Sequence, residues 1–158
     1  MAETQQAKPD VSSLPADTLD FARRMFDAAR EGNSSLLLSA VDAGLPVNLT
    51  NDKGNTLLML AAYAGHTELA KGLLDRGADP NRINDLGQSM VAGAVFKAHN
   101  DIVRTLMEKG ADPRLGTPNA IQAAQMFRRT ELMEVLGAQD EDLTAVPTPL
   151  PGATSPES

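Results

Sequence analysis

The chain has 158 residues, of which 42% are apolar, and this length and composition suit a single domain with its own core. Aromatic residues make up only 3% of the chain, with one Tyr, four Phe and no Trp, so the core must consist of Ala, Leu, Val and Met. Cysteine is absent, which excludes disulfide bonds, thiolate catalysis and Cys-ligated zinc.

The net charge of −7 is unevenly distributed along the chain. Residues 16–137 carry 13 basic and 15 acidic side chains, a balance of −2, and the two flanks contribute the remaining −5. Because no basic stripe is available for phosphates, we expect no nucleic acid partner. No apolar run approaches the roughly 18 residues of a membrane span, and the N-terminus lacks the pattern of a secretory signal. We therefore expect no membrane partner and a cytoplasmic protein.

The two ends of the chain differ in composition from the middle. Residues 1–15 are polar, and residues 139–158 are acidic, rich in Pro, Ser and Thr, and poor in large apolar groups. Such segments cannot bury enough surface to offset the entropy lost on ordering. The sequence therefore predicts a folded domain at 16–138 between two disordered segments.

A 33-residue internal repeat organises the folded part. The tetrapeptide Gly-Ala-Asp-Pro occurs at residues 77–80 and again at 110–113, and a shift of 33 also aligns the segments around it. Four copies result, at about residues 18–47, 48–80, 81–113 and 114–138, the last with three residues missing. A period of roughly 20 to 50 residues is typical of a stacked-repeat fold, because one unit cannot bury its own apolar face.

Each copy carries two short helical patterns. In the second copy, residues 55–63 place one Leu and two Ala (Leu58, Ala61 and Ala62) on one stripe, and residues 67–76 place three Leu (Leu69, Leu73 and Leu74) on another. Gly65 between them suits a left-handed connection between antiparallel helices, and Gly77 ends the second helix. The polar segment 81–88 that follows predicts a projecting finger before the next pair of helices.

This pattern resembles the ankyrin-repeat family. The family fingerprint is present as Gly54-x-Thr56-x-Leu58 and Ala61-Ala62, followed by Gly65-His66-x-Glu68, Leu73-Leu74 and Gly77-Ala78-Asp79. The resemblance covers residues 18–138. It implies an all-α solenoid of stacked helix-turn-helix units with short hairpin fingers, and a partner-recognition scaffold whose specificity lies in variable surface residues.

The later copies depart from the family pattern. In the third copy, Ala98 replaces the glycine between the helices, and Gly93 lies inside the first helix at a cost of about 1 kcal/mol. These changes predict that the third copy is the loosest internal unit. The fourth copy has Arg128 and Arg129 in place of Gly-His, and we expect copies one and four to act as caps.

The two histidines occupy equivalent positions in successive copies. His66, Glu68, His99 and Asp101 could face one another and bind a metal, so a small metal-binding protein or enzyme is the alternative function. The simpler interpretation is that each histidine fills the same structural position at the start of a second helix, where neutral imidazole satisfies buried turn groups. On this interpretation we expect no metal, no cofactor and no catalytic residue.

The candidate binding residues end the first helix of each copy, on the concave face beside the fingers if the resemblance holds. They are Arg30, Tyr63, Phe96 and Met126, together with Lys97 and Phe127 at the next position of the last two copies. Such a column is typical of interface anchors, but its members could also fill the seam between repeats, and both interpretations can hold. The fingers add Asp52, Lys53, Asp85 and Leu86, of which Leu86 is an apolar residue at a predicted tip.

We therefore expect a non-catalytic protein-protein interaction module that acts as a monomer. It would bind a partner protein through the concave face and the hairpin fingers, as an inhibitor, a stabiliser or an adaptor. The fold alone does not name the partner, because one fold hosts many roles.

Overall fold

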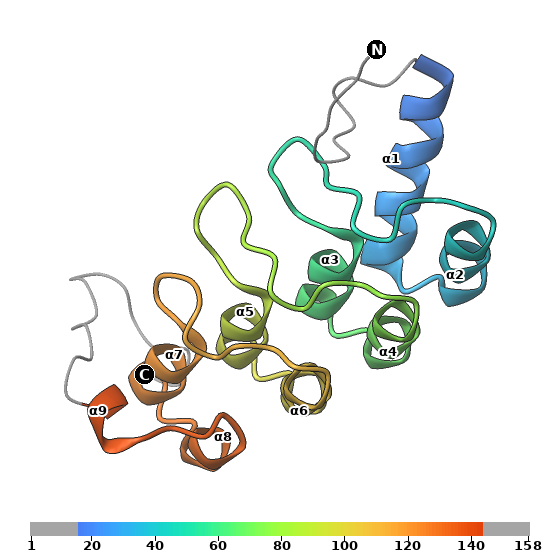
Figure 1. Ribbon diagram of the computed structural model, residues 1–158. Coiled ribbons are helices and arrows are strands. Elements are labelled where there is room, and N and C mark those ends of the chain that lie inside the picture. The colour runs from blue at the N-terminus through green and yellow to red at the C-terminus, as the bar shows by residue number, and fades with distance from the viewer. Residues whose placement is uncertain (1–15, 144–158) are drawn as a thin grey trace.

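The computed structural model describes residues 16–143 as a row of antiparallel helix pairs (Figure 1). The helices are α1 (Ala16–Glu31), α2 (Ser34–Asp42), α3 (Leu57–Ala64), α4 (Thr67–Asp75), α5 (Met90–Phe96), α6 (Asn100–Glu108), α7 (Ala120–Met126), α8 (Thr130–Val135) and α9 (Asp140–Leu143). The two helices predicted in the second copy are thus confirmed as α3 and α4, with boundaries shifted by one or two residues at some ends. The segments predicted to be disordered at 1–15 and 144–158 lie outside the described residues.

The pairs stack into two layers. Helices α1, α3, α5 and α7 contact one another in series to form the inner layer, and α2, α4, α6 and α8 form the outer layer. The loops before α3, α5 and α7 project to one side beside the inner layer (Figure 1), and the loop before α7 is the smallest. Isolated antiparallel bridges, Thr50 with Thr56 and Ile83 with Ser89, close the first two loops into hairpin fingers. The predicted all-α solenoid with fingers is confirmed.

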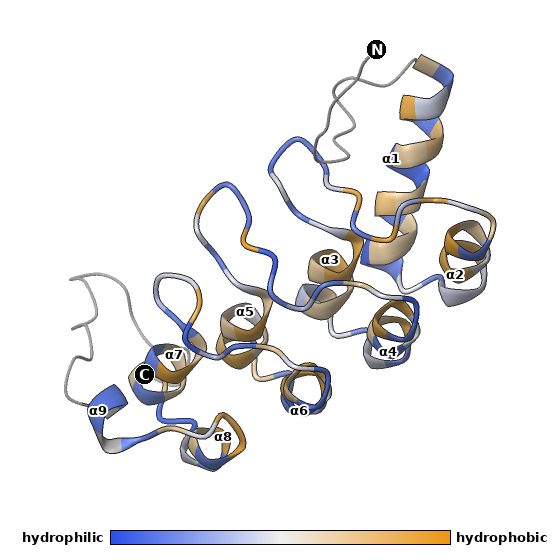
Figure 2. Cartoon of the chain, in the orientation of Figure 1, coloured by the Kyte–Doolittle hydropathy of each residue, from blue (hydrophilic) through white to orange (hydrophobic). Residues whose placement is uncertain are grey.

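The core is a continuous aliphatic seam between the two layers. The sides of the paired helices that face one another are apolar, whereas the fingers are largely polar (Figure 2). In α3 every residue from Leu57 to Ala62 is buried, because this helix is covered by α1, α5 and its own partner α4. A repeat unit buries its apolar surface mainly against its neighbours, as expected for a solenoid.

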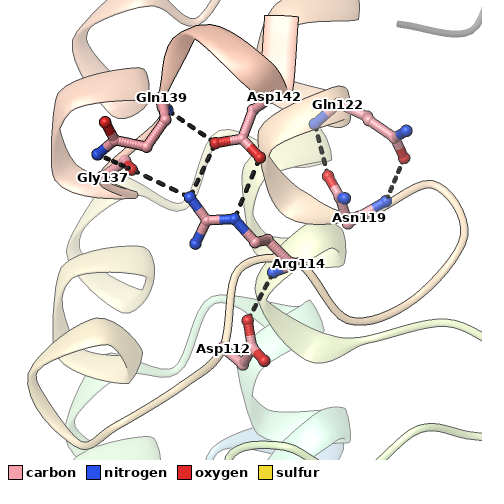
Figure 3. A network of polar contacts seen from close by, with 7 residues as sticks. All are labelled: Asp112, Arg114, Asn119, Gln122, Gly137, Gln139 and Asp142. Carbon is pink, nitrogen blue, oxygen red and sulfur yellow. Dashed lines mark hydrogen bonds and ion pairs between the residues drawn. The ribbon is translucent and has the colours of Figure 1, made fainter. Parts of the chain in front are cut away.

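A polar side chain at the base of each finger begins the next inner helix. The Thr56 Oγ1 accepts the backbone N–H of Met59 at 3.1 Å, and the Ser89 Oγ accepts that of Ala92 at the same distance. Asn119 does the same for α7, reinforced by the side chain of Gln122, which accepts the N–H of Asn119 at 2.9 Å (Figure 3). These caps satisfy N–H groups that the first turn of a helix leaves unpaired.

Successive repeats are joined by a side chain that reaches the backbone of the inner helix in the preceding repeat. The Nε2 of His66 lies 2.7 Å from the carbonyl oxygen of Arg30, and the Nε2 of His99 lies 3.1 Å from that of Tyr63. Both histidines stand directly before an outer helix. The structural interpretation of the histidines is therefore confirmed. In the fourth copy Arg129 occupies this position, with its Nη2 at 3.5 Å from the carbonyl oxygen of Phe96.

Glycine makes room for these imidazole rings. Gly32 and Gly65 adopt positive φ angles of 78° and 85°, and a Cβ atom there would lie 2.6 Å from the ring of His66 and 3.0 Å from that of His99. Ala98 and Arg128 take the same turn with φ angles of 62° and 58°. Non-glycine residues in this region carry local strain of about 1 kcal/mol or more, so the predicted loosening of the third copy has a physical basis at Ala98.

The C-terminal end of the stack extends beyond the predicted boundary at 138. Asn48 and Asn81, each at the start of a copy, accept the backbone N–H groups of Asp79 and Asp112 near the end of the same copy, at 2.8 and 2.7 Å. At the equivalent position of the fourth copy, the guanidinium of Arg114 instead donates hydrogen bonds to the carboxylate of Asp142 in α9 (Figure 3). The shorter of these bonds joins Arg114 Nη2 to Asp142 Oδ2 at 2.8 Å. This arginine holds the pKa of Asp142 below its usual value, chiefly through the hydrogen bond. Because α9 also contacts α7, residues 139–143 belong to the folded part rather than to a disordered tail.

We predict that His99→Ala destabilises the protein by about 1 kcal/mol, because the carbonyl of Tyr63 loses its partner and the space beside Gly65 is left empty. Urea denaturation followed by circular dichroism measures this change. Lys71→Ala, which truncates an exposed side chain of α4, is the control and should change the free energy of unfolding by less than about 0.5 kcal/mol. Equal effects of the two substitutions would contradict a role for His99 in joining repeats.

Candidate functional site

A pocket of about 360 Å³ opens on the inner layer between the third and fourth repeats. Its walls come from the end of α3, the base of the second finger, α5, the short finger before α7, and α7 itself. The lining residues are Tyr63, Gln88, Ser89, Ala92, Gly93, Phe96, Lys97, Thr117, Pro118, Ala123 and Phe127. Most of this surface is apolar, and three of its members are aromatic in a chain that has few aromatic residues. The volume lies near the lower end of the range for ligand pockets.

Tyr63 forms one wall of the pocket. The ring is half-buried, and the hydroxyl donates a hydrogen bond of 3.4 Å to the backbone carbonyl of Ser89 at the base of the finger. Burial raises the pKa of the Tyr63 phenol above its usual value near 10. Tyr63 thus bridges the second and third repeats, with its carbonyl bonded to His99 and its side chain laid against α5.

Gly93 is the residue of α5 that receives the Tyr63 ring. A Cβ atom built at this position would overlap the ring, closest to Cε1. The glycine that weakens α5 by its helix propensity is therefore required for the approach of Tyr63. The cost of Gly93 in helix propensity is therefore accompanied by a contact between repeats that a side chain at position 93 would block. That the third copy is the loosest internal unit stays a prediction.

Phe96 and Phe127 form the opposite wall. Their ring centroids lie 5.1 Å apart with an interplanar angle of 72°, an edge-to-face arrangement that aromatic pairs favour. Phe127 is half-buried, whereas Phe96 remains 48% exposed although its neighbours in α5 are buried. A large apolar side chain this exposed at a pocket edge is typical of a binding surface.

The charges near the pocket are positive. Among the described lining residues, Lys97 alone is charged, and Arg128 is exposed directly after Phe127. Within residues 16–143 neither side chain forms an ion pair. The acidic residue on the neighbouring finger, Asp85, lies against Gly54 of the preceding finger, where its carboxylate leaves no room for a side chain. The pocket is thus a local basic region on a chain of net charge −7.

The structure brings together four of the residues expected to bind a partner. Tyr63, Phe96, Lys97 and Phe127 line the pocket. The remaining candidates lie outside it: Arg30, which pairs with Asp27 at 3.0 Å, the half-buried Met126, and the exposed finger residues Asp52, Lys53, Asp85 and Leu86. Leu86 is 77% exposed, as expected for a finger tip.

Sequence reasoning missed the lining residues that come from small side chains and from the short finger. Ser89, Ala92, Gly93, Thr117, Pro118 and Ala123 were not among the candidates. Two signals pointed to them, namely the unusual glycine inside α5 and the three residues missing from the fourth copy. Both deviations from the repeat occur at this pocket.

The alternative metal site does not assemble within the described part of the chain. Residues 16–143 contain no group of three or more His, Asp or Glu side chains placed to hold a metal ion. The Nε2 atoms of His66 and His99 both face backbone carbonyl oxygens. The Asp101 carboxylate forms an ion pair on its own helix, with Oδ1 at 3.9 Å from the Nη1 of Arg104. Over the same range, no helix is both long enough and apolar enough to cross a membrane.

Comparison with known proteins identifies the class of protein. The family described as "Ankyrin repeats (3 copies)" matches residues 25–117, more than half of the chain. The protein therefore belongs to the ankyrin-repeat family, and the resemblance seen in the sequence is confirmed. Ankyrin repeats typically form non-catalytic modules for protein-protein interaction.

Two relatives illustrate the similarity. The putative ankyrin repeat protein PA3287 of Pseudomonas aeruginosa is 45% identical over 60 residues, which cover 38% of this chain and 33% of that protein. The crystal structure of the human ASB11 ankyrin repeat domain is similar with a TM-score of 0.67 at 28% sequence identity, covering 78% of this chain and 57% of that one. This chain thus spans about a third of the curated relative and little more than half of the solved domain.

We predict that Gly93→Ala displaces the Tyr63 ring and lowers the pKa of its phenol toward about 10. Tyr63 is the only tyrosine, so titration of phenolate absorbance reports on this residue alone. In the unchanged protein, the raised pKa favours the neutral folded form. Stability linked to Tyr63 is thus fully present below pH ~10 and is lost as the pH rises through the folded pKa.

The matched control is Gly72→Ala, which adds the same methyl group inside α4, where it meets Leu38 instead of the tyrosine. This control should leave the Tyr63 titration unchanged. An unchanged titration in Gly93→Ala as well would show that the glycine does not position the ring.

Proposed function

We propose that the protein binds a partner protein through its concave face, with the pocket formed by Tyr63, Phe96 and Phe127 at the centre of the contact. The observation that carries the proposal is that the sole Tyr and two of the four Phe meet at one open pocket between repeats. Aromatic side chains anchored in a partly buried position are enriched among the residues that contribute most to protein interfaces.

The fingers extend this surface. Asp52 and Lys53 on the first finger, and Asp85 and Leu86 on the second, are exposed beside the inner layer. Charged finger residues contribute little affinity individually, so we assign them a role in orienting the partner rather than in anchoring it. Leu86 supplies an apolar contact at the edge of the surface.

Within this function, the protein acts as an inhibitor, a stabiliser or an adaptor of the protein it binds, and it does so as a cytoplasmic monomer without catalysis. Family membership supports the binding role. The finer role, the location and the oligomeric state rest on the sequence interpretation alone.

We predict that Tyr63→Ala combined with Phe96→Ala weakens partner capture by at least about 2 kcal/mol, or roughly thirtyfold in affinity. Capture from an extract of the native cell, followed by titration of the captured protein, measures this loss. Circular dichroism should remain helical, because Tyr63 only packs against the edge of the buried core and Phe96 is exposed. Tyr63→Phe, which keeps the ring, should retain most of the affinity.

The matched control is Leu36→Ala, which removes a comparably exposed apolar side chain from the outer helix α2. Binding that survives the double substitution, or that is lost equally in Leu36→Ala, would contradict the concave-face assignment. A chain truncated after residue 143 tests whether the remaining tail carries the binding instead, and this cut preserves the contact of Asp142 with Arg114.

The metal alternative makes a separate prediction. We expect purified protein to contain less than stoichiometric metal, because both Nε2 atoms already face carbonyl oxygens. Elemental analysis of the protein and of the His66→Ala/His99→Ala variant measures this. One equivalent of metal that disappears in the variant would favour the metal-binding function over the one proposed here.

A further inference from the structure

The lining of the pocket is mostly apolar, and several of its polar groups already form hydrogen bonds within the protein. The Ser89 hydroxyl accepts the N–H of Ala92, and the Ser89 carbonyl accepts the Tyr63 hydroxyl. Both the side-chain oxygen and the backbone N–H of Gln88 are bonded to Asn84 within the finger. The Thr117 N–H donates to the Gly87 carbonyl at 3.1 Å. A group entering between the aromatic walls would meet mainly apolar surface, which favours an apolar group.

Lys97 is the exception among the lining residues. It caps the C-terminal end of α5, its side chain is exposed, and it forms no ion pair within the described residues. Arg128 and Arg129 add positive charge at the adjacent end of α7, and no lining residue is acidic. The field at the pocket edge is therefore positive, and it would attract a carboxylate held next to the buried group.

We propose that the pocket receives one large apolar side chain, aliphatic or aromatic, from a partner segment in which an adjacent Asp or Glu pairs with Lys97. The apolar side chain lies between Tyr63, Phe96 and Phe127, and the carboxylate stays at the rim, where it remains partly hydrated. This inference rests on the proposed function, since it names the chemistry of the partner at the same site. In this proposal the aromatic walls supply most of the affinity, whereas Lys97 supplies selectivity and speeds association.

Positions 144–158 do not supply such a segment. Beyond the described residues, positions 144–158 read TAVPTPLPGATSPES, in which Glu157 is the one acidic residue and lies far from Val146 and Leu150. The acidic cluster at 140–142 belongs to α9, where Asp142 is held by Arg114. In residues 1–15 the two acids, Glu3 and Asp10, are near in sequence only to Met1 and Val11. We therefore assign the segment to another protein rather than to an end of this chain.

The test is a selection of random peptides displayed on phage, carried out on the full-length protein and in parallel on Lys97→Glu. We expect peptides selected on the unchanged protein to share a large apolar residue with Asp or Glu within one or two positions. Selection on Lys97→Glu should retain the apolar residue and replace the acid with Lys or Arg. Titration calorimetry of one selected acidic peptide should show affinity about threefold weaker for Lys97→Gln, about tenfold weaker for Lys97→Glu, and a flatter dependence on salt in both.

Three other results would overturn the inference, and they separate it from the proposed function. The first result is a set of peptides that require Tyr63 and Phe96 but show no preference for Asp or Glu, or show a preference that does not change to Lys or Arg in Lys97→Glu. This result would refute the partner chemistry and leave the concave-face function intact. Failure to select any peptide that depends on Tyr63 and Phe96 would count against both. Selection that succeeds only after removal of residues 144–158 would assign the pocket to the tail of this chain.

Discussion

One kind of hydrogen bond recurs at the junctions between repeats and holds this stack in register. It joins the side chain directly before α4, α6 or α8 to a carbonyl at the end of the inner helix of the preceding repeat. The last carbonyls of a helix have no partner within the helix. Here they are satisfied by the next repeat, through His66, His99 and finally Arg129. Glycine at positions 32 and 65 lets the imidazole rings approach the turn closely. The same contact thus joins successive repeats and satisfies a carbonyl at the end of an inner helix.

This contact also explains how the concave face is free to vary. The residues whose carbonyls accept the hydrogen bonds, Arg30, Tyr63 and Phe96, are the same residues whose side chains were expected to face a partner. The hydrogen bond itself uses only their backbone, although the Tyr63 side chain also packs against α5 and bonds to the Ser89 carbonyl. The junction therefore fixes the backbone at these positions, and the side chains of Arg30 and Phe96 remain available for the proposed recognition. This division is what allows one solenoid to host many binding functions.

The candidate pocket arises where the periodicity is broken. Gly93 replaces a side chain inside α5 and allows Tyr63 to lie against that helix, and the short finger before α7 places Thr117 and Pro118 beside Ser89. Strain is tolerated nearby, since Ala98 and Arg128 both adopt positive φ angles that glycine adopts elsewhere in the stack. The residues that depart from the repeat pattern and are unfavourable for its helices or turns are thus concentrated around the surface proposed to bind a partner, as is common at functional sites.

The sequence by itself determined the repeat, the helix pairs, the aliphatic core and the column at the ends of the inner helices, because these follow from a 33-residue period and from local rules for helix ends. It also identified Tyr63, Phe96, Lys97 and Phe127 as candidates, since they are where the copies differ. The tertiary structure alone decided that these four share one pocket while Arg30 and Met126 do not. It also showed that Gly93 is required rather than merely unfavourable, and that residues 139–143 fold onto the stack through Arg114. Each of these depends on contacts between residues about 28 to 31 positions apart, and such contacts exist only once the repeats are stacked.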